Sequence, residues 1–344
     1  PDGRTLAYAS ERGGNWQLYL AKIARKEDPN FANATLIDEE VLLPSTVVER
    51  TMPAFSPDGK ELAFIEDRIR LMVLNLETKK VRQITDGSTW YSTAGGFTYR
   101  WSPDGRWFAL EFIGNGHDPY TDIGLVSADG KGQIFNLTGS GYFSSSPRWV
   151  MDGNALLFST ERYGMRNHAS WGSLEDVMLV FLNQDACDRY RLSKEDYELQ
   201  KQEKAEADKD KKDKDDDKDK KDGDKKDEVK LIEVELDGIE DRIVRLTPNS
   251  SRLGDAILSA DGESLYYMSA FEGGFDLWKM DLRKHDTKLL KKMDAGWASL
   301  TLDRKGDNLF ILSGRSMQKK NTKSDKLESI TYRAEMKMDL AEER

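Results

Sequence analysis

The sequence predicts an all-β protein, a six- or seven-bladed β-propeller of four-stranded antiparallel blades that carries one charged insertion. Three observations support this prediction. A Pro-Asp-Gly turn motif recurs along the chain, short apolar segments flank each copy, and the copies are spaced by about the length of one blade. Turn and flanking segments together predict hairpins, and the spacing predicts that each hairpin belongs to a four-stranded unit.

In the repeated turn, each residue type has a conformational role. Proline fixes φ at the first turn position, aspartate accepts hydrogen bonds from the backbone that follows it, and glycine accepts a positive φ. The motif is clearest at 1–8, 56–64 and 102–110, weaker at 151–158 and 260–267, and degenerate at 303–310. The predicted turn-forming residues are Asp2, Gly3, Asp58, Gly59, Asp104, Gly105, Asp152, Gly153, Asp261 and Gly262.

The segments before the turns are predicted to be the strands nearest the propeller axis. They are residues 51–55, 98–101, 146–149, 255–258 and 299–302. Three of these segments end in an aromatic residue, and Trp101 and Trp149 at equivalent positions are expected to pack between blades. The first unit has no such segment before its turn, so we expect residues upstream of Pro1 to close the ring.

The spacing of the turns exposes one insertion. The turn aspartates are at positions 2, 58, 104, 152, 261 and 303, and a blade takes about 40–50 residues. The long interval contains a low-complexity tract at 208–228, in which every residue except Gly223 is Asp, Lys or Glu. Such a tract cannot bury a core, so we expect it to be disordered or weakly helical.

We place the insertion at about 184–230. A strand is predicted before it at 177–182, and strands are predicted after it at 229–236 and 241–247. An exposed helix is expected at 193–206, with Ser193 as its N-cap.

Composition excludes several classes of protein. The chain has 52 Lys and Arg against 62 Asp and Glu, a formal net charge of −10, which excludes a basic nucleic-acid binder. No apolar run is long enough to predict a membrane span. A single cysteine, Cys187, excludes an intramolecular disulfide and a cysteine zinc cluster, and three scattered histidines make a metal site improbable. We therefore expect no metal and no cofactor.

Catalytic motifs are absent from the sequence. Neither the G-x-S-x-G elbow, nor H-E-x-x-H, nor a phosphate-binding G-x-x-x-x-G-K-[ST] loop occurs. We therefore predict no catalytic residue within these 344 residues.

The repeated Ser-Pro-Asp-Gly-(Lys/Arg)-x-Leu-Ala pattern resembles propellers of the TolB and prolyl-oligopeptidase type. The whole chain looks more like the second propeller of bacterial tricorn-like serine proteases, which are similar to tail-specific peptidases with PDZ domains. Three segments carry this resemblance: residues 101–111, residues 173–181 leading into the charged insertion, and residues 334–344.

The resemblance implies a non-catalytic propeller at 1–332 and, at 333–344, the start of a linker or helix that leads to a PDZ and protease domain. Such propellers are thought to filter or channel peptide substrates to a serine-type active site downstream. The resemblance also favours an exported, periplasmic protein, with a cytoplasmic one as the alternative, and it leaves a homo-oligomer open.

The polar residues that we expect to line the channel are Arg100, Arg148 and Asp255, because they lie on the predicted axis-lining strands. Two other functions stay open at this point. One is a TolB-like scaffold that docks a protein partner, and the other is the propeller of a dipeptidyl-peptidase-like hydrolase.

Overall fold

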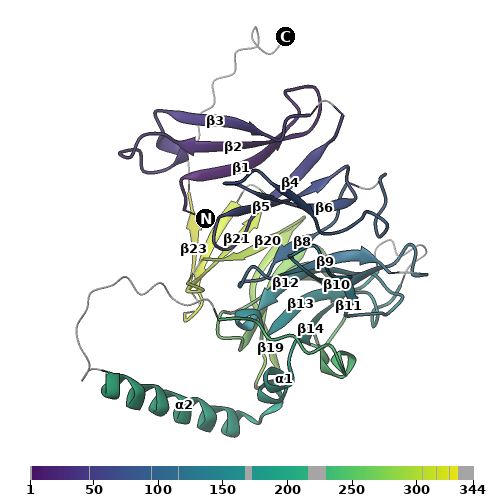
Figure 1. The fold of residues 1–344 in the computed structure, drawn as a ribbon. Coiled ribbons are helices and arrows are strands. Elements are labelled where there is room, and N and C mark those ends of the chain that lie inside the picture. Colours follow the sequence, from purple (N-terminus) through teal and green to yellow (C-terminus); the bar gives the residue numbers. More distant parts are fainter. Residues whose placement is uncertain are drawn as a thin grey trace. The chain divides into compact units, whose positions relative to one another are not determined.

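The computed structural model describes residues 2–45, 47–93, 95–114, 116–166, 173–215, 230–303, 305–314, 316–324 and 326–331. Six separate antiparallel sheets account for most of the regular structure in these residues, as Figure 1 shows. Two helices and a few short 3-10 turns make up the rest. The all-β prediction is therefore confirmed. Contacts divide the chain into two compact units, Pro1–Met165 with Glu175–Pro248, and Arg166–Leu174 with Asn249–Arg344.

The first unit contains four sheets. In chain order, they are formed by β1 (Thr5–Ser10), β2 (Gln17–Ile23) and β3 (Ile37–Leu42); by β4 (Arg50–Phe55), β5 (Glu61–Glu66), β6 (Arg70–Asn75) and β7 (Val81–Gln83); by β8 (Tyr99–Trp101), β9 (Trp107–Ile113), β10 (Thr121–Ser127) and β11 (Phe135–Asn136); and by β12 (Ser144–Val150), β13 (Ala155–Thr160), β14 (Asp176–Phe181) and β15 (Ile243–Arg245).

The second unit contains two sheets. They are formed by β16 (Arg252–Leu258), β17 (Ser264–Ala270), β18 (Phe275–Asp281) and β19 (Asp286–Ala295), and by β20 (Ser299–Leu302), β21 (Asn308–Ser313), β22 (Ser316–Asn321) and β23 (Leu327–Ile330).

Strands that follow one another in the chain are neighbours in every sheet, which is the meander of a propeller blade. In four of the five four-stranded sheets an Asp-Gly turn joins the first strand to the second, as at Asp58, where Phe55 pairs with Leu62. The first sheet has three strands, and β1, which follows the turn at Asp2, lies at its edge. This matches the expectation that the first unit lacks the strand before its turn.

Side-chain hydrogen bonds close the clearest turns, and the serine before the proline takes part. Ser56 Oγ donates to Asp58 Oδ1 at 2.7 Å, and Asp58 Oδ1 also accepts the backbone N–H of Lys60 at 3.1 Å. The same pair of bonds recurs at Asp104 and Asp261. Gly59 has φ +72°, which a residue without a Cβ adopts at little cost.

The fourth turn differs from the others. Met151 and Asp152 both have positive φ there, at 52° and 55°, and form a 3-10 turn with Gly153. This copy has Val150 and Met151 where the clearer copies have serine and proline, so it lacks both the hydroxyl that binds the aspartate and the ring that fixes φ near −65°. The copy at Asp261 lacks only the proline, and it keeps the serine bond and the ordinary turn.

Neighbouring sheets of the first unit pack face to face through apolar side chains. Leu18 and Leu20 of the first sheet meet Leu62, Phe64 and Leu74 of the second. Similar clusters join the second sheet to the third and the third to the fourth. In the second unit, Tyr266, Met268 and Leu277 pack with side chains of the last sheet. Burial of this apolar area is the main driving force for such packing.

A helix begins at residue 184, close to the place where the sequence analysis put the start of the insertion. Helix α1 (Gln184–Arg191) is capped by the side chain of Asn183, which accepts the N–H of Ala186. Helix α2 (Lys194–Asp215) follows, and Ser193 Oγ accepts the N–H of Asp196 as the N-cap prediction required. Helix α2 is nine residues longer than expected and continues into the charged tract. The rest of the tract, and the predicted linker at 333–344, lie outside the described residues.

One prediction next to the insertion is wrong. Of the strand expected at 229–236, the described residues 230–236 belong to no sheet, and the sheet resumes only at β15, so the connection between β14 and β15 runs to residue 242. Residues 230–242, here named the return segment, instead pack their apolar side chains between the third and fourth sheets. Ile232, Val234, Leu236 and Ile239 gain burial there without a strand partner. Cys187 of helix α1, a helix that the sequence did not predict, is fully buried.

Candidate functional site

Each predicted channel residue lies on the first strand of a four-stranded sheet: Arg100 on β8, Arg148 on β12 and Asp255 on β16. In the first unit the first strands of the four-stranded sheets are β4, β8 and β12, and hydrogen bonds from aromatic side chains join them. Trp101 Nε1 donates to Ala54 O at 3.2 Å, and Trp149 Nε1 donates to Arg100 O at 3.1 Å. Each tryptophan at the end of a first strand therefore fixes its strand to the first strand of the preceding sheet.

Two of these strands contain a β-bulge marked by a residue with positive φ. Met52 has φ 55° and Ser146 has φ 58°, and the pairing register shifts at both places. A proline follows each bulge residue, where the ladder offers no partner for an N–H. This Pro-x-aromatic pattern before the turn is a signal that sequence reasoning overlooked.

Neighbouring sheets satisfy the polar groups of both bulges. Tyr99 Oη donates to the carbonyl of Met52, and Ser146 N donates to Glu111 Oε1 at 2.6 Å. Burial raises the pKa of the Glu111 carboxyl, while the Ser146 N–H and the nearby Arg100 charge oppose that shift. The bulges therefore work as connectors between blades.

Arg100 and Arg148 occupy equivalent positions, each directly before the tryptophan near the end of its strand. Arg100 on β8 is exposed and pairs with Ala109, and Arg148 on β12 is partly buried and pairs with Leu157. The two strands contact each other. The structure thus brings these two predicted channel residues onto neighbouring strands of one unit.

Asp255 lies in the second unit, on β16. Its Oδ1 accepts the N–H of Ala256 at 2.8 Å, and its Oδ2 accepts the N–H of Leu300 at 2.7 Å. The carboxylate therefore joins β16 to β20. Its channel-lining role stays a prediction.

Sequence reasoning missed a threonine that ends three of the repeats. Thr85, Thr138 and Thr247 each follow an aliphatic residue at the end of a fourth strand. Their hydroxyl oxygens accept the N–H of Leu71, Ile123 and Val177 on the third strands. Thr138 and Thr247 also donate to buried aspartates, Asp122 and Asp176. The repeated Ile-Thr or Leu-Thr pair was the available signal.

Among the histidines that the structure describes, His117 and His285, a chemical role can be argued for His117. Its Nδ1 lies 2.5 Å from Asp122 Oδ2. However, Asp122 also accepts hydrogen bonds from Asn136, Thr138 and Ser140, so it organises the loops at one end of the third sheet. The pair is explained by this structural role.

The described residues contain no group of three or more His, Cys, Asp or Glu side chains placed to hold a metal ion. None of the helices in that part of the chain combines the length and the apolar composition that a membrane crossing requires.

The tryptophan bonds give a first testable prediction. We expect Trp149→Phe to lower the free energy of unfolding by about 1 kcal/mol, because the ring is kept and one hydrogen bond is lost. Trp90→Phe is the matched control, since Trp90 Nε1 is buried without a hydrogen-bond partner among the described residues. Urea denaturation of both variants checks this. Equal losses in the two variants would contradict the connecting role of Trp149.

Comparisons with known proteins agree with this architecture. Tricorn protease is similar in structure over 95% of this chain, with a TM-score of 0.60 and 12% sequence identity. An oligogalacturonate lyase from Vibrio parahaemolyticus is similar over 95% of the chain, with a TM-score of 0.57 and 13% identity. No protein-family model matches the chain.

Sequence relatives point to the same group of propellers. TolB of the Tol-Pal system from Francisella tularensis is 32% identical over 89 residues, 24% of this chain and 18% of TolB. A tricorn-like protease C-terminal subunit from Sulfurisphaera tokodaii is 27% identical over 108 residues, 31% of this chain and 12% of that protein. The matched part is thus less than a fifth of each relative, and the match to tricorn protease covers 29% of that chain.

The chain therefore has a β-propeller fold, and the resemblance to tricorn and TolB propellers that the repeats predicted is confirmed. Since the similar structures include a protease and a lyase, the fold by itself does not decide the function.

Proposed function

We propose that this chain is the non-catalytic propeller of a tricorn-like serine protease, which filters or channels peptides to an active site outside residues 1–344. Similarity to tricorn protease over 95% of the chain supports the proposal, as does the relative named as a tricorn-like protease subunit. In this proposal residues 1–332 form the propeller, residues 333–344 lead to the PDZ and protease part, and the protein works in the periplasm.

The observation that carries the proposal is the pair Arg100 and Arg148 at equivalent positions on neighbouring first strands. Guanidinium groups bind carboxylates strongly and in a defined orientation. They also attract anions over several ångströms and raise their local concentration. Two arginines on adjacent strands could therefore select peptides by an acidic side chain or by the terminal carboxylate.

The test is a double charge reversal, Arg100→Glu with Arg148→Glu, in the protein that contains the protease part. We expect hydrolysis of long acidic peptides to fall about tenfold, because attraction becomes repulsion, while short neutral peptides are cleaved at the original rate. Lys131→Glu with Lys305→Glu is the matched control, because both lysines are exposed and give the same change in net charge. Unchanged hydrolysis of every peptide would remove the support for channelling.

A second candidate function is a TolB-like scaffold that docks a protein partner. The 32% identity with TolB over 89 residues favours it. A stable complex that forms with equal affinity whether or not the two arginines are reversed would favour the scaffold over the channel.

A further inference from the structure

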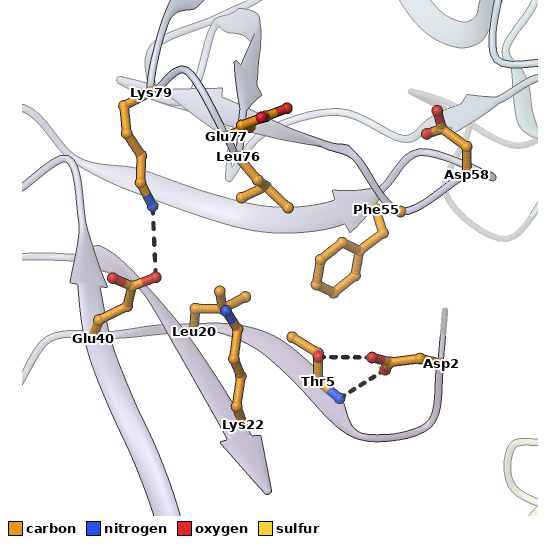
Figure 2. Close-up of a pocket in the computed structure, with 11 residues that line it drawn as sticks. Asp2, Thr5, Leu20, Lys22, Glu40, Phe55, Asp58, Leu76, Glu77 and Lys79 are labelled. Carbon is orange, nitrogen blue, oxygen red and sulfur yellow. Dashed lines mark hydrogen bonds and ion pairs between the residues drawn. The ribbon is translucent and has the colours of Figure 1, made fainter. Parts of the chain in front are cut away.

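A cavity of about 410 Å³ lies between the first and second sheets of the first unit, next to the turns at Asp2 and Asp58. Figure 2 shows Leu20, Phe55 and Leu76 around the same space, which gives the cavity an apolar wall. The proposed channelling function does not use this cavity.

Charged side chains surround the apolar wall. Four carboxylates line the cavity, and two lysines oppose them: Asp2, Glu40, Asp58, Glu77, Lys22 and Lys79. Lys79 is already paired with Glu40, at 3.6 Å. The lining therefore carries a net negative charge.

The same position between the third and fourth sheets is occupied by the chain itself. When the repeats are aligned on their turns and on the strand pairings that follow, Leu20 matches Leu125 and Leu76 matches Leu182. Both of these matching residues belong to the same apolar cluster as Ile232 of the return segment. Gly59 matches Gly153, at which an added Cβ would lie 2.4 Å from Ile232 Cδ1. The cavity is thus the repeat equivalent of a groove that holds an extended segment with an aliphatic side chain.

A turn aspartate holds that segment by its backbone. Ile232 N donates to Asp104 Oδ2 at 2.9 Å, and the Arg106 guanidinium donates to Ile232 O. Asp2 is the equivalent of Asp104 and lines the cavity. The equivalent of Arg106 is Arg4, which donates instead to Asp28 O and Arg25 O of its own sheet's loop. The first sheet therefore has the equivalent aspartate, Asp2, beside the cavity, but its equivalent arginine, Arg4, binds the loop of its own sheet.

The intervening groove, between the second and third sheets, is closed by backbone contact. A Cβ added to Gly130 would lie 2.5 Å from Gln83 O, and Arg82 Nε donates to Ala128 O at 2.8 Å. Between the first and second sheets, the contact at the corresponding place is the Lys79–Glu40 ion pair, and each of these side chains is 52% exposed. That exposed pair can rearrange at little cost.

We propose that this cavity binds an extended peptide segment of a partner, with an aliphatic side chain against Leu20, Phe55 and Leu76 and with basic residues on either side of it. The binding mode is inferred from the occupied groove. There the Ile232 side chain packs in the apolar cluster, and the Ile232 N–H donates to the turn aspartate, Asp104. Excess carboxylates in the lining supply the preference for basic flanks. This inference does not rest on the channelling proposal, because the two sites use different residues.

The experiment measures peptide binding to the 344-residue chain by fluorescence anisotropy. The probe is Lys-Leu-Ile-Lys-Val-Lys-Leu, the sequence of residues 230–236 with both glutamates replaced by lysine. We expect the unmodified sequence to bind about tenfold more weakly, because its glutamates face the carboxylates. Aspartate in place of the isoleucine should abolish binding, because a charge would enter the apolar wall.

Protein variants locate the site. Glu40→Lys with Glu77→Lys should weaken binding of the basic probe about tenfold, and both residues are exposed, so the fold should tolerate the change. Glu11→Lys with Glu272→Lys makes the same change of net charge at exposed positions outside the cavity lining and should leave binding unchanged.

Equal effects of the two double variants, or cross-links from the probe that map only to residues outside the cavity lining, would overturn the proposal. Self-association of the chain that excludes the probe would assign the groove to a second copy and would overturn it as well. Loss of channelling in the arginine variants with probe binding intact would separate the two proposals.

Discussion

Asp104→Ala is expected to lower the free energy of unfolding by about 3 kcal/mol, whereas Asp58→Ala should lower it by about 1 kcal/mol. Both aspartates sit at the same position of the same turn motif. The side chain of Asp58 is 57% exposed and that of Asp104 is 0% exposed. Comparing the two variants therefore separates the contribution of the turn to the free energy of unfolding from the contribution of the buried contacts.

The difference arises from the partners of the two carboxylates. Both accept a serine hydroxyl and the N–H two residues on. Asp104 also accepts Arg106 Nε at 2.8 Å and Ile232 N at 2.9 Å. Removing it leaves buried donors without acceptors, which costs more than the loss of a solvated bond. It also releases the backbone of the return segment.

Urea denaturation of both variants measures the two losses. Hydrogen exchange should show faster exchange in residues 230–242 for Asp104→Ala and no change there for Asp58→Ala. Equal losses, with the return segment still protected in both variants, would show that the turn alone explains the effect.

Glu175→Gln is expected to stabilise the protein at pH 8 by about 1–3 kcal/mol and to have little effect at pH 4. Burial raises the pKa of Glu175 to about 7, and the charges of Glu161 and Asp176 add to the shift, while a hydrogen bond from Ser159 opposes it. The neighbouring Glu161 also has a buried oxygen, Oε2, which has no hydrogen-bond partner among the described residues.

The direction follows from proton linkage. A carboxyl with a higher pKa in the folded state than in the unfolded chain binds its proton more tightly when the protein is folded. The contribution of Glu175 to the stability of the folded protein should therefore decrease as the pH rises from about 4.5 to about 7. Glutamine is close to the neutral carboxyl in shape and has no such dependence.

The measurement is urea denaturation of both proteins at several pH values between 4 and 8. The stability of the variant relative to the native sequence should increase through this window and level off above pH 7. Glu272→Gln, at an exposed position, is the control and should show no such trend. A difference that is independent of pH would contradict the elevated pKa.

Local features made the architecture predictable. The residues of each Asp-Gly turn lie within a few positions of one another, so the local sequence is enough to predict the turn. The strands beside the turns, the start of the insertion and the Ser193 cap were predicted for the same reason. The weak fourth turn was visible as a departure from proline at Met151, although its two positive φ values were not.

The features that could not be predicted from the sequence depend on contacts between residues that are far apart in the chain. A strand was predicted at 229–236 because the segment is apolar and alternating, and such a pattern suits either a sheet or a groove. The segment lies in the groove because Asp104 and Arg106 bind the backbone of Ile232, and these two residues lie more than 120 positions earlier in the chain. The role of Asp255 likewise depends on Leu300 N, which comes from the next sheet.

The sequence by itself determined the turns and the blade pattern, because each of these repeats with a local signature. Asp2, Asp58 and Asp104 look alike in that pattern. Only the tertiary structure decided that Asp104 is buried under the return segment while Asp2 and Asp58 border an open cavity. The physical reason is that a groove between two sheets is defined by which segment fills it, and that segment can come from any part of the chain.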